Sequence, residues 1–162
     1  MDRLTTIELA KEYLKFSAAH FTIFSATERE RLHGHNFTVS ATITAPVDEN
    51  GLCFRYSIFK QHLKKLCRSL DEYTLIAARS PHLIINEQES YYRVTFNNQD
   101  MLLLQSDTLL LPIKNTTVEE LSYYLLDNLL TDNTIIADNN VQALAITVCS
   151  GPGQSGSACW SK

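Results

Sequence analysis

The clearest pattern of hydrophobic and polar positions along this chain lies in residues 36–45. The run Asn-Phe-Thr-Val-Ser-Ala-Thr-Ile-Thr-Ala alternates polar and apolar side chains with a period of two, which predicts a strand with one buried face. Residues 7–24 are rich in β-forming and small residues and predict further strand structure. Residues 141–149 alternate again and predict the last strand of the fold.

Two helices are predicted by apolar residues that recur at helical spacing. In the first, Ser57 can serve as N-cap, and the buried stripe is formed by Phe59, Leu63, Leu66 and Leu70. His62 lies at the edge of this stripe, so we expect it to be structural and not a metal ligand. In the second, Thr117 and Glu120 have the spacing of a capping box, and the stripe is formed by Leu121, Tyr124, Leu125 and Leu129.

Residues 76–113 have the least regular pattern. Within them, residues 91–96 and 101–104 predict a hairpin around Asn97-Asn98-Gln99-Asp100, because this polar run is typical of a turn. The chain contains no internal repeat, no low-complexity tract and no linker. We therefore predict a single domain over residues 1–162.

Composition and charge narrow the class of protein. With 162 residues, 44% hydrophobic and 20% charged, the chain suits one globular domain with a sizeable core. A net charge of −4 gives no electrostatic basis for binding nucleic acid or an anionic membrane. The sequence contains no apolar run of membrane-spanning length and no signal-like N-terminus, and its cysteines have no C-x-x-C spacing. We expect a cytoplasmic protein with reduced thiols.

The histidines are the strongest candidates for chemistry. His33 and His35 lie in Leu32-His-Gly-His-Asn-Phe37, and on a strand both would point to the same face. The run Phe16-Ser-Ala-Ala-His20 also has an extended pattern, so a neighbouring strand would add a third imidazole. Three neutral imidazoles with an open fourth position are typical of catalytic zinc. Spacing alone leaves open the alternative that His-Gly-His is only a turn or a strand end.

The glycine-rich run near the C-terminus resembles a dinucleotide-binding motif in its letters. Residues 151–156 match G-x-G-x-x-G in letters. A dinucleotide site would need a helix to begin there and an acidic residue about 20 positions further on. Too little chain follows Gly156 for either, so we do not expect a dinucleotide cofactor.

Five motifs occur together in a characteristic order: Phe16-Ser-Ala-Ala-His20, Leu32-His-Gly-His-Asn-Phe37, Leu70-Asp71, Asn115-Thr-Thr-Val-Glu119, and a strand leading into Gly151-Pro-Gly-Gln154. In this order the chain resembles the family of 6-pyruvoyltetrahydropterin synthase and 6-carboxytetrahydropterin synthase. The resemblance covers nearly the whole chain, and residues 76–113 look like the insertion of a longer branch.

The resemblance implies a fold and an assembly. The fold is the α+β tunnelling fold, an antiparallel four-stranded sheet with two helices on one face, here with an inserted hairpin. Related subunits join edge to edge into trimeric barrels that pair as hexamers, so we expect a homo-oligomer of six chains. The resemblance also implies Zn²⁺ on His20, His33 and His35, and a pterin-like small molecule bound between subunits.

The chain departs from the family pattern at several places, among them Arg55, where an aspartate often precedes the first helix. Residues 26–32 lack the cysteine base that usually precedes His-Gly-His, and Glu30 lies where a glutamate replaces it in a divergent branch that cleaves the dihydroneopterin side chain. The family's Asp-His pair reads Asp71-Glu72. The carboxylate that usually anchors the pterin aligns with Ser150, whose hydroxyl would hold the ring N–H groups more weakly.

These motifs predict a zinc-dependent lyase acting on 7,8-dihydroneopterin, its triphosphate or a related compound. Glu30 would be the base or acid, with Asp71 and Glu72 as a secondary relay. The predicted substrate-binding residues are Thr116, Thr117, Glu119 and Ser150, with the helix start facing a neighbour's metal site.

Three alternatives stay open. Ser150 also suits an enzyme of the same fold with a non-pterin substrate. Glu72 also suits a non-catalytic oligomer that only holds zinc. Glu30 can equally be a solvated loop charge, which is what we expect of Glu28, Arg29 and Arg31.

Overall fold

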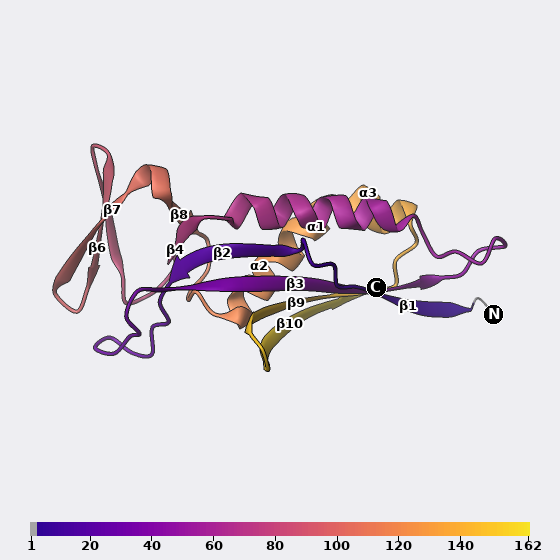
Figure 1. Cartoon of the computed structure of the whole chain (residues 1–162), viewed down its shortest axis with the longest axis horizontal. Helices are drawn as coiled ribbons and strands as arrows, with labels where there is room; N and C mark the ends of the chain where they lie inside the picture. Colours follow the sequence, from indigo (N-terminus) through magenta and orange to yellow (C-terminus); the bar gives the residue numbers. More distant parts are fainter. Residues whose placement is uncertain (1–2) are drawn as a thin grey trace.

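The computed structural model describes residues 3–162 and consists of a large sheet, helices on one of its faces and a small second sheet (Figure 1). The large sheet has seven strands in the order β10-β9-β3-β2-β4-β8, with β1 also paired to β3. Its strands are β1 Leu4–Leu9, β2 Lys15–His20, β3 His33–Pro46, β4 Tyr73–Ala77, β8 Thr108–Leu111, β9 Ala143–Gly151 and β10 Gln154–Ser161. The helices are α1 Tyr56–Leu70, α2 Val118–Leu130 and α3 Asn133–Asp138, and a short 3-10 helix spans Gln105–Asp107.

The long strand β3 organises the sheet. Its alternating residues place one set of side chains in the core, namely Phe37, Val39, Ala41, Ile43 and Ala45. β1 pairs with the second half of β3, whereas β2 pairs with the first half. The end of β2 therefore lies beside the start of β3.

The helices α1 and α2 cover the same face of the sheet and share one core with it. α1 contributes Phe59, Leu63, Cys67 and Leu70, and α2 contributes Leu121, Leu125, Leu126 and Leu129. Under the helices, Phe16 of β2 stacks on Phe37 of β3, with ring centroids 5.0 Å apart. None of the helices in residues 3–162 is long and apolar enough to cross a membrane.

The α+β class is confirmed, but the predicted four-stranded antiparallel sheet is wrong. β4 and β8 extend the sheet, with β4 parallel to both β2 and β8. Each has only four or five residues without clear alternation. The strand β9 is also not the last one, because β10 pairs with it antiparallel. Ser57 lies inside α1, whose cap position is occupied by Arg55 without a side-chain hydrogen bond.

The second sheet lies at one end of the molecule (Figure 1) and consists of β5 Ile84–Gln88, β6 Tyr91–Phe96 and β7 Gln99–Leu104. The predicted hairpin is present as β6 and β7, and β5 adds a third strand that the sequence pattern did not predict. Asn97 and Asn98 join the hairpin with φ angles of 47° and 60°. Two successive residues with positive φ form the tight turn whose twist matches that of a hairpin.

Candidate metal centre and cavity

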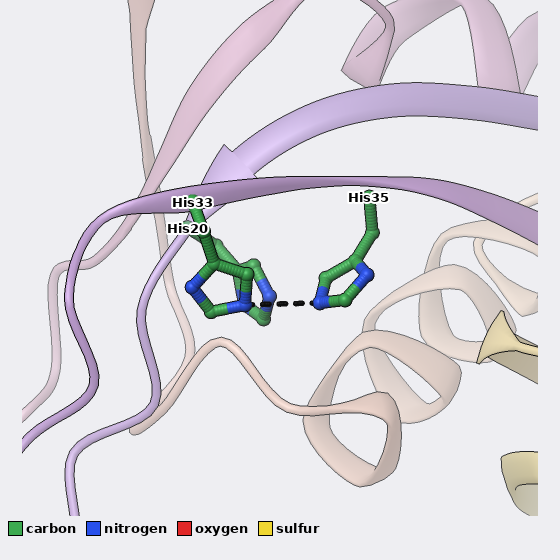
Figure 2. A group of neighbouring side chains, drawn as sticks. All are labelled: His20, His33 and His35. Atoms are coloured by element: carbon green, nitrogen blue, oxygen red, sulfur yellow. Dashed lines mark hydrogen bonds between the residues drawn. The ribbon is translucent and has the colours of Figure 1, made fainter.

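Strand pairing brings three histidines together. His20 at the end of β2 is the direct antiparallel partner of His33 at the start of β3, and His35 follows two residues later on the same face of β3. One ring nitrogen from each lies within 4.8 Å of the others. Figure 2 shows His33 and His35 projecting from β3 to the same side, with His20 beside His33. The predicted meeting of three imidazoles is confirmed.

The hydrogen bonds of these rings fit a metal site. The Nδ1 atom of His20 lies 2.7 Å from the Thr116 carbonyl oxygen, and Nδ1 of His33 lies 2.7 Å from that of Arg31. Since a carbonyl only accepts, both Nδ1 atoms carry the proton, and in the neutral rings the lone pairs are on Nε2. Nε2 of His20 is buried and has no partner within the described residues. Nε2 of His33 and of His35 lie 2.9 Å apart.

The burial of His20 favours its neutral form. Its side chain is only 5% exposed, and removal from water lowers the pKa of the imidazole despite the opposing hydrogen bond to Thr116. The neighbouring His33 and His35 also lower this pKa. A neutral imidazole is the form that binds metal ions. The positions of the three rings and the lowered pKa of His20 therefore both favour the binding of one cation.

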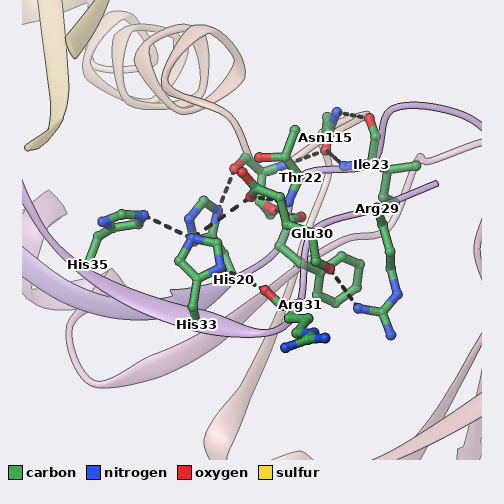
Figure 3. A network of polar contacts seen from close by, with 11 residues as sticks. His20, Thr22, Ile23, Arg29, Glu30, Arg31, His33, His35 and Asn115 are labelled. Carbon is green, nitrogen blue, oxygen red and sulfur yellow. Dashed lines mark hydrogen bonds and ion pairs between the residues drawn. The ribbon is translucent and has the colours of Figure 1, made fainter.

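Glu30 lies beside the histidines on the loop that joins β2 to β3 (Figure 3). Its Oε2 atom accepts from the Thr22 backbone N–H at 3.0 Å and lies 3.8 Å from Nε2 of His33. Partial burial works against ionisation, but the hydrogen bonds from Thr22 and the nearby His33 and His20 together lower the pKa of the carboxyl. Glu30 is thus held in place, unlike a freely solvated loop charge.

A cavity of about 300 Å³ extends from this cluster to the start of α2. Its lining consists of His20, Thr22, Phe24, Glu30, His35, Phe37, Thr117, Val118, Glu119, Ser150, Gln154 and Ser155. The structure therefore brings most of the predicted site residues into one cavity of one chain. The helix start faces the metal cluster of its own chain, which corrects the expectation that it faces a neighbour's.

The start of α2 has two threonines with different roles. Thr116 is 2% exposed, and its Oγ1 donates to the Phe21 carbonyl at 2.8 Å, so it lies behind the cavity and fixes His20. Thr117 is the N-cap predicted from the sequence, since its Oγ1 accepts from the Glu120 N–H at 3.3 Å. The capping box is only half formed, because the Glu120 carboxylate accepts from the Lys114 N–H instead.

Asp71 and Glu72 do not lie in this cavity. The Asp71 carboxylate accepts from the Ser17 N–H at 2.7 Å, and the Glu72 N–H donates to the Ser17 carbonyl at 2.7 Å. Both contacts tie the end of α1 to β2. Glu72 lines a different depression, together with Ser17 and Asn36. Within one chain, the Asp71 side chain and the Glu72 backbone therefore have a structural role.

Several cavity residues were missed by the sequence analysis. Thr22 and Phe24 lie in the loop after β2, although residues 7–24 were expected to be mostly strand. Gln154 and Ser155 belong to the glycine-rich run that was considered only as a dinucleotide motif. The motif Gly-Pro-Gly-Gln was part of the family resemblance and offered the one available signal for Gln154.

The fold and the cavity define an α+β protein with a three-histidine group that can bind a metal ion. The chain belongs to the 6-pyruvoyl tetrahydropterin synthase family, whose model matches residues 8–158. This membership confirms the resemblance found in the motifs, and it implies a lyase-type enzyme.

Individual relatives cover almost the whole chain. A Methanocaldococcus jannaschii protein, provisionally named 6-carboxy-5,6,7,8-tetrahydropterin synthase, is 24% identical over 92% of this chain and 90% of its own length. The 6-pyruvoyl tetrahydropterin synthase of Plasmodium vivax is 27% identical, with a TM-score of 0.94 over 99% of this chain and all of that chain. The Plasmodium falciparum enzyme is 25% identical, with a TM-score of 0.93 over 98% and 99%. Two further P. vivax structures are catalytic residue mutants, with a glutamate changed to cysteine or to alanine.

Proposed function

We propose that this protein is a zinc-dependent lyase of the 6-pyruvoyl/6-carboxytetrahydropterin synthase type that acts on 7,8-dihydroneopterin triphosphate or a related compound. The observation that carries the proposal is the position of Glu30, 3.8 Å from Nε2 of His33 and inside the same cavity. A carboxylate at this place can take the role that a cysteine base has in other members. The P. vivax relative, with its catalytic glutamate, supports this assignment.

The donor set favours zinc. Three neutral imidazoles with a fourth position open to a cavity are the ligands of a catalytic zinc ion. When bound, this ion would supply Lewis-acid polarisation of substrate oxygen atoms. Thr116 and Arg31 act through their carbonyl groups, because they keep the protons of His20 and His33 on Nδ1.

Proton transfer and substrate binding are assigned to residues of the cavity. Glu30 would accept a proton from the substrate side chain at the edge of the metal cluster. The N-terminus of α2 offers free N–H groups to substrate oxygen or nitrogen atoms, and Thr117 and Glu119 line the cavity there. Glu119 is the other carboxylate in the lining, so it would accept hydrogen bonds from the N–H groups of a heterocycle.

Ser150 supports a second candidate function. It lines the cavity where the family pattern has an anchoring carboxylate, and a hydroxyl binds a guanidine-like edge less strongly. An enzyme with the same metal cluster and base but a non-pterin substrate would have this change. Substrate assays with dihydroneopterin compounds and with other polyol-bearing heterocycles distinguish the two.

We also propose that the protein forms a homo-oligomer, with six chains as the expected number. The large sheet has open edges at β10 and β8, and closure of several sheets into a barrel would cover them. Asp71 and Glu72 would contribute to a relay only if a neighbouring copy brought them to its cavity. Light scattering tests this, and a mass of one chain would contradict it.

The first experiment tests the base. The protein is incubated with 7,8-dihydroneopterin and its triphosphate, and the products are identified by mass spectrometry. We expect Glu30→Gln to lower kcat by about 10²- to 10⁴-fold, because the base is lost. Glu28→Gln removes the same charge from an exposed position of the same loop and should keep full activity. Full turnover by Glu30→Gln would contradict the assignment.

The second experiment tests the metal. Protein purified without a histidine tag should contain about one zinc ion per chain, and His33→Ala should lose it. His62→Ala is the matched control, because His62 lies on α1 outside the cluster. Absence of zinc from the wild-type protein after growth with the metal would exclude a zinc-dependent function.

A further inference from the structure

Arg29, the residue before Glu30, is not the solvated charge that the sequence suggests. Its guanidinium carbon lies 4.9 Å from the ring centroid of Phe21 and 5.6 Å from that of Phe96. Its Nη1 atom donates to the Glu30 carbonyl oxygen at 2.7 Å. A planar guanidinium over aromatic rings has both a cation–π attraction and a fixed orientation.

The two rings join the Glu30 loop to the small sheet. Phe21 and Ile23 belong to the loop, whereas Phe96 and Val94 belong to β6, and all four are buried in one cluster with Ile76. This cluster is separate from the core under the helices. The small sheet therefore packs its buried face against the segment that carries Glu30.

The loop is also held from its other side. Oδ1 of Asn115 accepts from the Ile23 N–H at 3.0 Å, and Nδ2 of Asn115 donates to the Ile23 carbonyl at 2.8 Å. The Glu30 N–H donates to the Thr22 carbonyl at 2.8 Å, so the loop is closed on itself. The segment before α2 and the small sheet thus hold the loop between them.

The geometry explains how a distant contact can direct Glu30. Neighbouring side chains of an extended segment point to opposite sides, and Arg29 forms an antiparallel bridge with Ile23. In Figure 3, Arg29 extends away from the three histidines while Glu30 points toward them. If Arg29 is fixed on the small sheet, Glu30 is fixed toward the cavity.

We propose that the sheet β5–β7 is a support for the Glu30 loop, and that Arg29 and Phe96 are positioning residues for the Glu30 carboxylate. The proposal rests on the proposed function in that Glu30 acts as the base. A general base needs a fixed distance and direction to the proton that it removes, and small displacements lower the rate strongly. Arg29 and Phe96 provide this although neither of them lines the cavity.

The test compares two arginine-to-leucine variants. Arg29→Leu removes the stacked guanidinium, and we expect kcat to fall at least about tenfold with little change in KM. Arg79→Leu is the matched control, because Arg79 is exposed and its side chain has no hydrogen bond or ion pair in the described part of the chain. Arg29→Lys keeps the positive charge, and its kcat should lie between those of Arg29→Leu and the wild type. In a Glu30→Gln background, Arg29→Leu should lower kcat no further, because the group it positions is gone.

Phe96 is tested from the side of the small sheet. Phe96→Leu keeps an apolar side chain but removes the ring under Arg29, and we expect kcat to fall about threefold to tenfold. Tyr91→Leu removes an aromatic ring from the same strand, where 43% of the residue is exposed, and should have no effect on kcat.

Hydrogen exchange gives a readout that does not depend on activity. In Arg29→Leu, amides in residues 21–31 should exchange about tenfold faster than in wild type, while those of β3 and β9 are unchanged. Equal loop exchange and equal kcat in Arg29→Leu and Arg79→Leu would overturn the support role. A wild-type protein that converts no dihydroneopterin compound would contradict the proposed function alone, and loop exchange would still decide whether the small sheet holds the loop.

Discussion

The two sheets of this protein bury their side chains in different ways. The seven-stranded sheet packs one face against α1 and α2. The core between them contains residues from strands that precede β3 in the sequence and from strands that follow it. The three-stranded sheet has no helix of its own, and its buried face packs against the Glu30 loop and the strands β4 and β8. The large sheet is therefore covered by helices, whereas the small sheet buries its apolar face against the Glu30 loop and the β4–β8 edge of the large sheet.

The outer faces of the two sheets differ as well. Along β3, the residues between the core positions are the polar Thr38, Ser40, Thr42 and Thr44. On the small sheet, Ile84 and Leu102 are 63% and 59% exposed. A strongly amphipathic sheet has one way to pack, while a sheet with apolar groups on both faces depends on a specific contact to fix its position. Arg29 and Phe96 provide such a contact.

The largest effect is expected from Phe37→Ala in the large sheet. Phe37 is fully buried and contacts Phe16, and its ring centroid lies 5.3 Å from that of His20. Removal of the ring should lower the free energy of unfolding by about 3–5 kcal/mol. Urea denaturation measures this. Thr38→Ala, on the opposite face, is the control and should change the value by less than about 0.5 kcal/mol.

A matched pair of valine-to-alanine variants tests the comparison directly. Val148 on β9 and Val94 on β6 are both fully buried, and loss of two methyl groups should cost about 2 kcal/mol at either site. We expect Val148→Ala to lower the global free energy of unfolding, whereas Val94→Ala should mainly raise hydrogen exchange in β5–β7 and residues 21–31. Equal losses of global stability would show that the two sheets unfold as one unit.

The sequence predicted the parts of the fold that depend on local patterns. The period of two in residues 36–45 predicted β3, and the cap at Thr117 predicted the start of α2. β4 and β8 were missed because they are short and because about 30 residues separate these two paired strands in the sequence. β10 was missed because its serines and glycine are typical of loops.

The site divides in the same way. His33 and His35 followed from strand alternation, and the pairing of His20 with His33 needed only an adjacent strand. The position of Arg29 could not be predicted, because it depends on Phe96, which is 67 residues away in the chain. A charged loop residue that packs against two aromatic rings has no local signal in the sequence.

Thr117→Ala should have a smaller effect than the core variants. The Thr117 hydroxyl caps α2 by accepting from the Glu120 N–H, and loss of a cap costs about 1 kcal/mol. Since Thr117 also lines the cavity, KM should rise in the same variant. Thr131→Ala, at the other end of α2, is the control for the helix alone and should leave KM unchanged. A stability loss without a change in KM would limit Thr117 to its capping role.

The smallest effect is expected at the turn between β6 and β7. Asn98 has a φ of 60°, which glycine adopts without strain, and glycine is the preferred second residue of this type of turn. Asn98→Gly should therefore stabilise the small sheet by about 0.5 kcal/mol, whereas Asn98→Val, with a branched side chain at positive φ, should destabilise it by about 1 kcal/mol. Hydrogen exchange in β5–β7 measures both changes, while urea denaturation of the large sheet should detect neither.

If the small sheet supports the Glu30 loop, the two variants should also change the hydrogen-exchange rates of residues 21–31, in opposite directions. Unchanged exchange of residues 21–31 in both variants would show that the stability of the turn does not affect the Glu30 loop. Support of the loop by the small sheet would then depend on the contact between Arg29 and Phe96 alone.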